Sequence, residues 1–167
     1  MPTRYQLEAA VTTACERLAE KDRPLFKRNV NERSLSHKFA IYLQQQVDAW
    51  TEGWDVDCEF NRDARDTGED YVKQLDLINK FDSLTTNVHD EHAKTVFPDI
   101  IVHQRGFRNN LLVVEIKKNT ATPASVAFDK QHKLQAYVHQ MEYQAAVFVL
   151  LEMTNVSCSV EWIKHLG

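Results

Sequence analysis

The chain has few glycines and cysteines. Only four glycines occur among 167 residues, and none belongs to a Gly-rich phosphate loop or to a nucleophile elbow. The three cysteines, Cys15, Cys58 and Cys158, are widely spaced and form no Cys-x-x-Cys pair. This spacing argues against a disulfide framework and against a zinc site, and it favours a reducing compartment.

Long hydrophobic runs are also missing. No stretch approaches the length of a membrane span, and the first residues lack the apolar segment of a secretory signal. We therefore expect a cytoplasmic protein with no membrane partner. At 167 residues and 43% hydrophobic content, the chain is long enough to form a single domain over residues 1–167 with a substantial core.

Positive charge is in short supply, with a formal net charge of −4. Surfaces that bind nucleic acid are usually basic, so the total is unfavourable for that class of partner. The distribution is uneven, however: residues 21–38 hold six Lys and Arg against two acids, whereas residues 55–91 hold eleven acids against four Lys and Arg. Because the local field decides where phosphate binds, residues 21–38 and the turn Arg105–Arg108 are the candidate phosphate-facing segments.

Helix periodicity appears three times. Residues 3–21 predict an amphipathic helix, and Asn31 predicts the N-cap of a second helix that runs to about Trp50. A third helix is expected from about Ala124 to Met141, after Pro123. Gln131 lies within the apolar stripe of this helix, so we expect it to face inward, where it either bonds nearby backbone or serves a buried site.

Strand patterns account for much of the remainder. Residues 54–61 alternate between apolar and polar side chains, with Asp55 and Asp57 expected in solvent, and residues 62–96 form a polar insertion. This insertion contains one amphipathic piece, formed by Tyr71, Val72, Leu75, Ile78 and Phe81. Its His89–His92 segment is expected to be a solvated loop. Residues 145–152 predict a buried strand and residues 156–163 an edge strand.

The most informative segment is a predicted β-hairpin. Two aliphatic runs, Phe97–His103 and Leu111–Lys118, flank a polar connection from Gln104 to Asn110. If the hairpin is centred near Phe107, Val113 lies opposite Ile101 and Glu115 lies opposite Asp99. Directly opposed carboxylates repel each other unless a cation lies between them.

Two interpretations of these residues remain open. Asp99 and the Glu115–Lys117 pair are either structural, as a strand start and a cross-strand ion pair, or they share a divalent metal and a water. The apolar run before Glu115 favours the second, because it drives the carboxylate toward a covered region where an unpaired charge is costly.

The pattern Pro98-Asp99, a gap, then Glu115-Ile116-Lys117 resembles the motif of the PD-(D/E)xK nuclease superfamily. The resemblance covers roughly residues 30–152. It implies an α/β fold with a restriction-endonuclease-like core, in which helices flank a mixed central sheet. Two additions are expected here: an extra N-terminal helix and an insertion between the first two strands.

The resemblance also implies a site. Asp99, Glu115 and the Ile116 carbonyl would hold Mg²⁺, with Mn²⁺ as a substitute, and Lys117 would orient or help deprotonate the attacking water. Members of the superfamily often place a Glu of the first helix in or beside the metal site, so Glu32 is a candidate ligand, although an acid in a first turn is also favoured by the helix dipole alone. Gln131 on the later helix is the fourth candidate catalytic residue.

The implied function is metal-dependent hydrolysis of phosphodiester bonds, with DNA as the default substrate. The residues do not distinguish DNA from RNA. The alternative is a catalytically silent module of the same fold that binds nucleic acid or a protein partner. No recognition domain is evident for either function, so target selection would depend on a homodimer, on the insertion or on a partner subunit.

Overall fold

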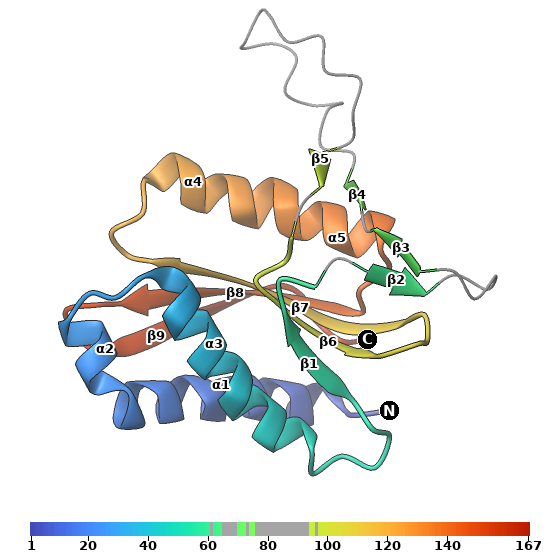
Figure 1. Cartoon of the computed structure of the whole chain (residues 1–167), viewed down its shortest axis with the longest axis horizontal. Helices are drawn as coiled ribbons and strands as arrows, with labels where there is room; N and C mark the ends of the chain where they lie inside the picture. The colour runs from blue at the N-terminus through green and yellow to red at the C-terminus, as the bar shows by residue number, and fades with distance from the viewer. Residues whose placement is uncertain (61, 65–69, 73, 76–93, 96) are drawn as a thin grey trace, which may run out of the picture.

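Five strands form the central sheet. The computed structural model describes residues 1–60, 62–64, 70–72, 74–75, 94–95 and 97–167. The strands of the sheet are β1 (Asp55–Cys58), β6 (Ile100–Gln104), β7 (Asn109–Lys118), β8 (Ala145–Glu152) and β9 (Ser157–Lys164). They lie side by side in the order β1-β6-β7-β8-β9, with β7 and β8 parallel and all other neighbours antiparallel (Figure 1). The mixed sheet and its helices confirm the predicted α/β class.

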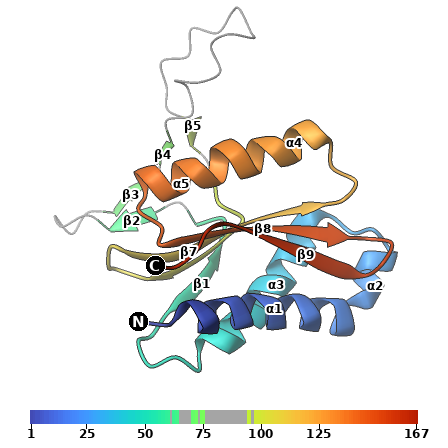
Figure 2. The ribbon, with the colours of Figure 1, turned by 180° about the vertical axis from the view of Figure 1, so that it is seen from behind.

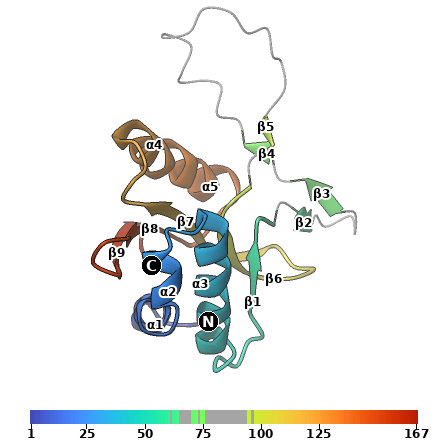
Figure 3. The same cartoon turned by 60° about the vertical axis from the view of Figure 1, so that its left-hand side comes forward.

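Helices cover both faces of this sheet. On one face lie α1 (Arg4–Lys21), the short α2 (Arg23–Lys27) and α3 (Glu32–Val47); on the other lie α4 (Pro123–Phe128) and α5 (Leu134–Gln140). The two layers are seen from behind in Figure 2 and are well separated in Figure 3. Each layer encloses its own apolar core, so the sheet is covered on two sides as the aliphatic strands predicted.

The β6–β7 hairpin has the predicted register. Ile101 pairs with Val113, and the last pair, Ile100 with Val114, leaves Asp99 and Glu115 next in line. Alternate residues of the hairpin go to opposite cores: Ile100 and Val114 face α1 and α3, and Ile101 and Val113 face α5.

The turn of the hairpin is shorter than predicted. Pairing continues through a bulge after Val102 to Gln104 and Asn109, so that only residues 105–108 connect the strands. The Asn109 side-chain amide donates to Gln104 Oε1 at 2.5 Å. Gly106 adopts the left-handed conformation that a tight turn requires. Gln104 and Asn109 are therefore the end residues of the two strands and not part of the connecting loop.

The first helices begin at capping residues. Thr3 caps α1 in a capping box with Gln6, and the side chain of Asn31 accepts the Ser34 amide at 2.8 Å at the start of α3. The sequence did not predict α2, because proline usually ends a helix and Pro24 is the second residue of α2. Proline fits the first turn of a helix, where its missing N–H costs nothing.

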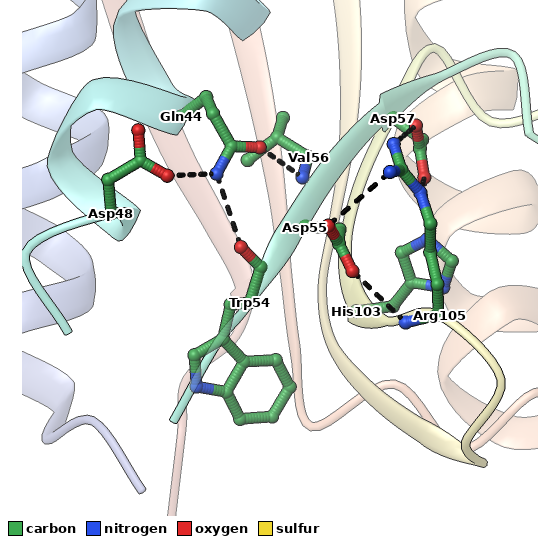
Figure 4. A network of polar contacts seen from close by, with 8 residues as sticks. All are labelled: Gln44, Asp48, Trp54, Asp55, Val56, Asp57, His103 and Arg105. Carbon is green, nitrogen blue, oxygen red and sulfur yellow. Dashed lines mark hydrogen bonds and ion pairs between the residues drawn. The ribbon is translucent and has the colours of Figure 1, made fainter. Parts of the chain in front are cut away.

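The outer edge of β1 contacts α3 through Gln44. The Gln44 amide nitrogen donates to the Trp54 carbonyl at 3.2 Å and to Asp48 Oδ1 at 2.7 Å, and its oxygen accepts the Val56 amide at 2.6 Å. Figure 4 shows these bonds beside the strand. They join α3 to a strand that has a sheet neighbour, β6, on one side only.

The expectation that Asp57 is solvated was wrong. Its carboxylate lies 2.8 Å from His103 Nε2 and accepts from Arg105 Nε at 2.8 Å, while Asp55 accepts the Arg105 amide at 3.2 Å (Figure 4). Burial by itself would raise the pKa of Asp57, but Arg105 and His103 outweigh it and hold this pKa below its usual value. Strand alternation placed Asp57 on the open face; it did not reveal that His103 of β6 and Arg105 of the following turn are its partners.

The insertion between β1 and β6 contains short strands. β2 (Arg62–Ala64) pairs with β3 (Asp70–Val72), and β4 (Gln74–Leu75) pairs with β5 (Lys94–Thr95), both antiparallel. The predicted amphipathic piece thus includes strand residues at Tyr71, Val72 and Leu75. Its remaining members and the His89–His92 segment lie outside the described residues.

Candidate catalytic site

Asp99 and Glu115 are neighbours at the end of the β6–β7 pairing, where β6 begins. Asp99 immediately precedes β6, and its Oδ2 accepts the Ile116 amide of β7 at 2.8 Å. The amide and carbonyl of one strand residue point to the same side, so the Ile116 carbonyl is directed to the same region as Asp99. Asp99 and Glu115 are therefore brought together, as the hairpin register predicted, and the Ile116 carbonyl lies beside them.

Glu115 is fully buried, with 0% of its surface exposed. Its Oε2 accepts from Lys133 Nζ at 2.7 Å, and its Oε1 meets no donor within the part of the chain that the structure describes. A buried oxygen without a donor is uncommon in proteins, and it often marks a position where an ion or water binds. The carboxylate is thus only half satisfied by the described residues.

The charge of Asp99 opposes the ionisation of Glu115, whereas a hydrogen bond from Glu115 favours the charged form of Asp99. Burial, followed by the charge of Asp99, raises the pKa of Glu115 well above its usual value, and Lys133 acts against this. Burial also raises the pKa of Asp99, although Lys133, the Ile116 amide and Lys117 favour its charged form. Carboxyl groups with perturbed pKa values are typical of functional sites, because two adjacent acids repel each other when both are ionised and this costs stability.

Lys117 joins three elements. Its ammonium lies 3.0 Å from Glu32 Oε1 of α3 and 3.2 Å from Asp129 Oδ2 of the opposite helical layer. Burial alone would lower the pKa of Lys117, but the hydrogen bond to Glu32 and the charges of Asp129 and Asp99 raise it above the ordinary lysine value. The raised pKa favours the protonated ammonium, and the role of Lys117 toward the attacking water stays a prediction. The ammonium is suited to orienting groups and to offsetting negative charge.

Glu32 lies at the first residue of α3 and contacts the end of β7. Its Oε1 accepts from Lys117 and its Oε2 accepts the Lys118 amide at 3.1 Å. Lys118 Nζ in turn bonds Asn29 Oδ1 and the Val30 carbonyl. These contacts fix Glu32 as the residue that positions Lys117; its role as a metal ligand stays a prediction.

The expectation that Gln131 faces inward was wrong. A π-helical turn, Asp129–Lys133, separates α4 from α5, and within it Gln131 is exposed whereas Asp129 is buried. Counting back from Leu134 at α-helical spacing selects Lys130 and Gln131 as inward positions. The wider π turn shifts the inward positions to Asp129 and Lys133. Gln131 is therefore not among the residues that contact Asp99, Glu115 or Lys117.

Sequence reasoning missed Asp129, Lys133 and Tyr137. Periodicity places Lys133 off the apolar stripe, where a lysine is usually solvated, and π turns have no sequence signature comparable to a capping box. Tyr137, one turn beyond Lys133, is fully buried. Burial, and then the charge of Glu115, raises the pKa of Tyr137, so the phenol stays neutral on the apolar side of the site.

A pocket of about 390 Å³ leads to Asp99. It lies between the start of α3 and the end of β1, and its lining includes Glu32, Glu59 and Asp99. The exposed Arg33 pairs with Glu59 at 2.6 Å at its rim. Asp99 is thus accessible from this pocket, whereas Glu115 is not part of its lining.

The residues present fit a hard divalent cation. No cluster of three or more His, Cys, Asp or Glu side chains in metal-binding arrangement occurs among the described residues, but Mg²⁺ usually keeps several waters and takes one or two carboxylates. Asp99, Glu115, Asp129 and Glu32 place four carboxyl groups around the two ammonium groups of Lys117 and Lys133. A divalent cation would offset the carboxylate charge that two ammonium groups leave uncompensated.

The two candidate phosphate-facing segments lie at different distances from this site. Residues 21–38 include the start of α3, which bonds β7 through Lys118. The Arg105–Arg108 turn lies at the far end of the hairpin from Asp99 (Figure 1), where Arg105 pairs with Asp57 and Arg108 lies 3.5 Å from Glu142. Only the first segment adjoins the site, and a phosphate-facing role of the turn stays a prediction.

Comparisons of the chain with models of protein families, with curated proteins and with solved structures find no significant match in any of the three. None of the helices in the described part of the chain combines the length and the apolar composition that crossing a bilayer requires.

Proposed function

We propose that the protein is a metal-dependent nuclease with a restriction-endonuclease-like core. The observation that carries this proposal is the juxtaposition of Asp99 and Glu115, two carboxyl groups with raised pKa values, within reach of the cationic Lys117. The element order, a helix, a hairpin, a second helical segment and a strand parallel to β7, supports it.

Each residue has a defined task in this proposal. Asp99, Glu115 and the Ile116 carbonyl would hold Mg²⁺ or Mn²⁺, which would supply Lewis-acid stabilisation to the phosphoryl group. Lys117, held by Glu32 and Asp129, places a fixed positive charge beside the position of the scissile phosphate. Tyr137 and the apolar core beneath it keep water from the inner side of the carboxylates.

The first prediction is that cleavage requires the metal. Purified protein should cleave DNA with Mn²⁺ or Mg²⁺ and lose this activity in excess EDTA. Single-stranded, duplex and branched DNA and RNA are compared in parallel, because the site residues do not select among them. Glu161→Gln is a matched control: Glu161 belongs to β9 and pairs with Lys130 of the π turn. Absence of metal-dependent cleavage of every substrate would contradict the proposal.

A second prediction concerns the basic segment beside the site. Lys27, Arg28 and Arg33 are exposed, and replacing them together by Ala should weaken binding to a DNA duplex in Ca²⁺. The salt slope of binding should fall by up to roughly one unit per lost phosphate contact. Arg108→Ala, at the far end of the hairpin, should leave the slope unchanged. Equal slopes for the triple variant and the wild type would exclude this surface.

One observation favours the alternative of a catalytically silent module. The Glu115–Lys133 pair already provides the carboxylate with a positive charge. A silent module of this kind would bind nucleic acid or a protein partner without needing a divalent cation. Calorimetry with Mn²⁺ separates the two, because only the nuclease requires the cation to reach Asp99 and Glu115.

A further inference from the structure

Lys133 is the cation nearest to Glu115. Its ammonium lies 2.7 Å from Glu115 Oε2, and only 12% of its side chain is exposed. Its charge is also the largest influence that favours the ionised form of Asp99. The π turn makes this contact possible, because a regular helix would direct Lys130 and Gln131 inward in its place. Irregular turns of this type are frequent at functional sites.

The position of Lys133 also closes the site. The pocket reaches Asp99 but not Glu115, which has no exposed surface. A hydrated divalent cation that binds both carboxylates must bring water to Glu115. On the helical side Lys133 already holds one of the two Glu115 oxygens, Oε2, so this side chain has to move when a cation takes that oxygen.

A second acceptor is available to the displaced ammonium. Asp129, four residues earlier on the same turn, is 5% exposed, and its Oδ2 lies 3.2 Å from Lys117 without hydrogen-bond alignment. An ammonium leaving Glu115 can therefore approach Asp129 or an oxygen of the substrate phosphate without losing all compensation of its charge.

We propose that Lys133 is an internal counter-ion of Glu115 that a divalent cation displaces, so that this lysine sets the affinity of the site for metal. The inference rests on the proposed function, since it concerns the same carboxylates. It adds a positioning residue and predicts weak metal binding, because each cation that enters must compete with an ion pair that is already formed.

Calorimetric titration with Mn²⁺ at pH 8 tests this exchange. Lys133→Met keeps the length of the side chain and removes its charge, so it should bind Mn²⁺ about tenfold more tightly or better than the wild type. Lys133→Arg keeps the charge and should bind no more tightly than the wild type. Lys130→Met is the matched control, because Lys130 lies on the same turn but pairs with Glu161, and it should match the wild type.

A chemical measurement on the wild type does not depend on how the variants fold. Acetylation of Lys133 by N-hydroxysuccinimide acetate, followed by mass spectrometry, should be slow without metal and several-fold faster with saturating Mn²⁺. Lys130 is the internal reference. Unchanged reactivity of Lys133, or a Lys133→Met protein that binds Mn²⁺ no more tightly than the wild type, would overturn the exchange and leave the nuclease proposal standing. If neither protein binds Mn²⁺, both proposals fail.

Discussion

Asp99→Asn should abolish most cleavage and yet make the protein more stable at neutral pH. Asn can still accept the Ile116 amide that Asp99 Oδ2 accepts now, so the hairpin end is preserved. The metal, however, loses a charged ligand. Lewis-acid stabilisation is worth several kcal/mol and each 1.4 kcal/mol is tenfold in rate, so turnover should fall by about a hundred- to a thousandfold.

The gain in stability follows from the raised pKa values of the pair. Asp99 and Glu115 hold protons more tightly in the folded protein than in the unfolded chain. The free energy of unfolding therefore decreases as the pH rises from the ordinary carboxyl range through the raised pKa values. Asp99→Asn removes one of the two titrating groups and, by removing the Asp99 charge, lowers the pKa of Glu115.

Urea unfolding in EDTA at pH 4.5 and pH 8 measures this effect. We expect Asp99→Asn to exceed the wild type by about 1 kcal/mol at pH 8, roughly 2–4 °C in Tm, with a smaller difference at pH 4.5. Mn²⁺ should raise the Tm of the wild type, as a ligand of the folded state does, but not that of the variant. A variant that is less stable than the wild type at pH 8 would show that the two carboxylates do not repel.

Lys117→Met should reduce both turnover and stability. The loss of a fixed charge at the scissile phosphate should lower the rate by about two orders of magnitude or more. Unlike Asp99, Lys117 also holds the fold together, because it pairs with Glu32 of α3 and with the buried Asp129. Removing one partner leaves buried charge uncompensated, at a cost of about 3–5 kcal/mol.

The two effects are separated by a double variant. Lys117→Met with Asp129→Asn removes the uncompensated charge and should recover part of the lost free energy of unfolding, but none of the lost turnover. Urea unfolding and cleavage are measured on the same preparations. Recovery of turnover together with stability would show that Lys117 acts through folding alone.

The hairpin was predictable because strand alternation and a short connection fix its register. A shift by one residue would have moved Ile101 and Val113 out of their core, so the positions of Asp99 and Glu115 followed from apolar residues. Asn31 was similarly informative, since a capping side chain acts on the amide three residues ahead.

The partners of the charged residues were not predictable in this way. Glu32 is 85 residues from Lys117 in sequence, and nothing local to either residue encodes their contact. Gln131 failed for a different reason: periodicity assumes a constant number of residues per turn, and one π turn was enough to replace it with Asp129 and Lys133. Local pattern thus located the carboxylates, and tertiary packing decided which cations surround them.

The amide of Gln44 has a consequence for how copies of the protein can associate. An exposed edge strand is a template for another chain, and proteins commonly protect such edges with charge, proline or a bulge. A side-chain amide has the same donor and acceptor as a peptide unit, and Gln44 uses both on the Val56 amide and the Trp54 carbonyl. A second chain that adds to β1 would first have to displace Gln44, so strand exchange at this edge is disfavoured, and a homodimer would have to form through another surface.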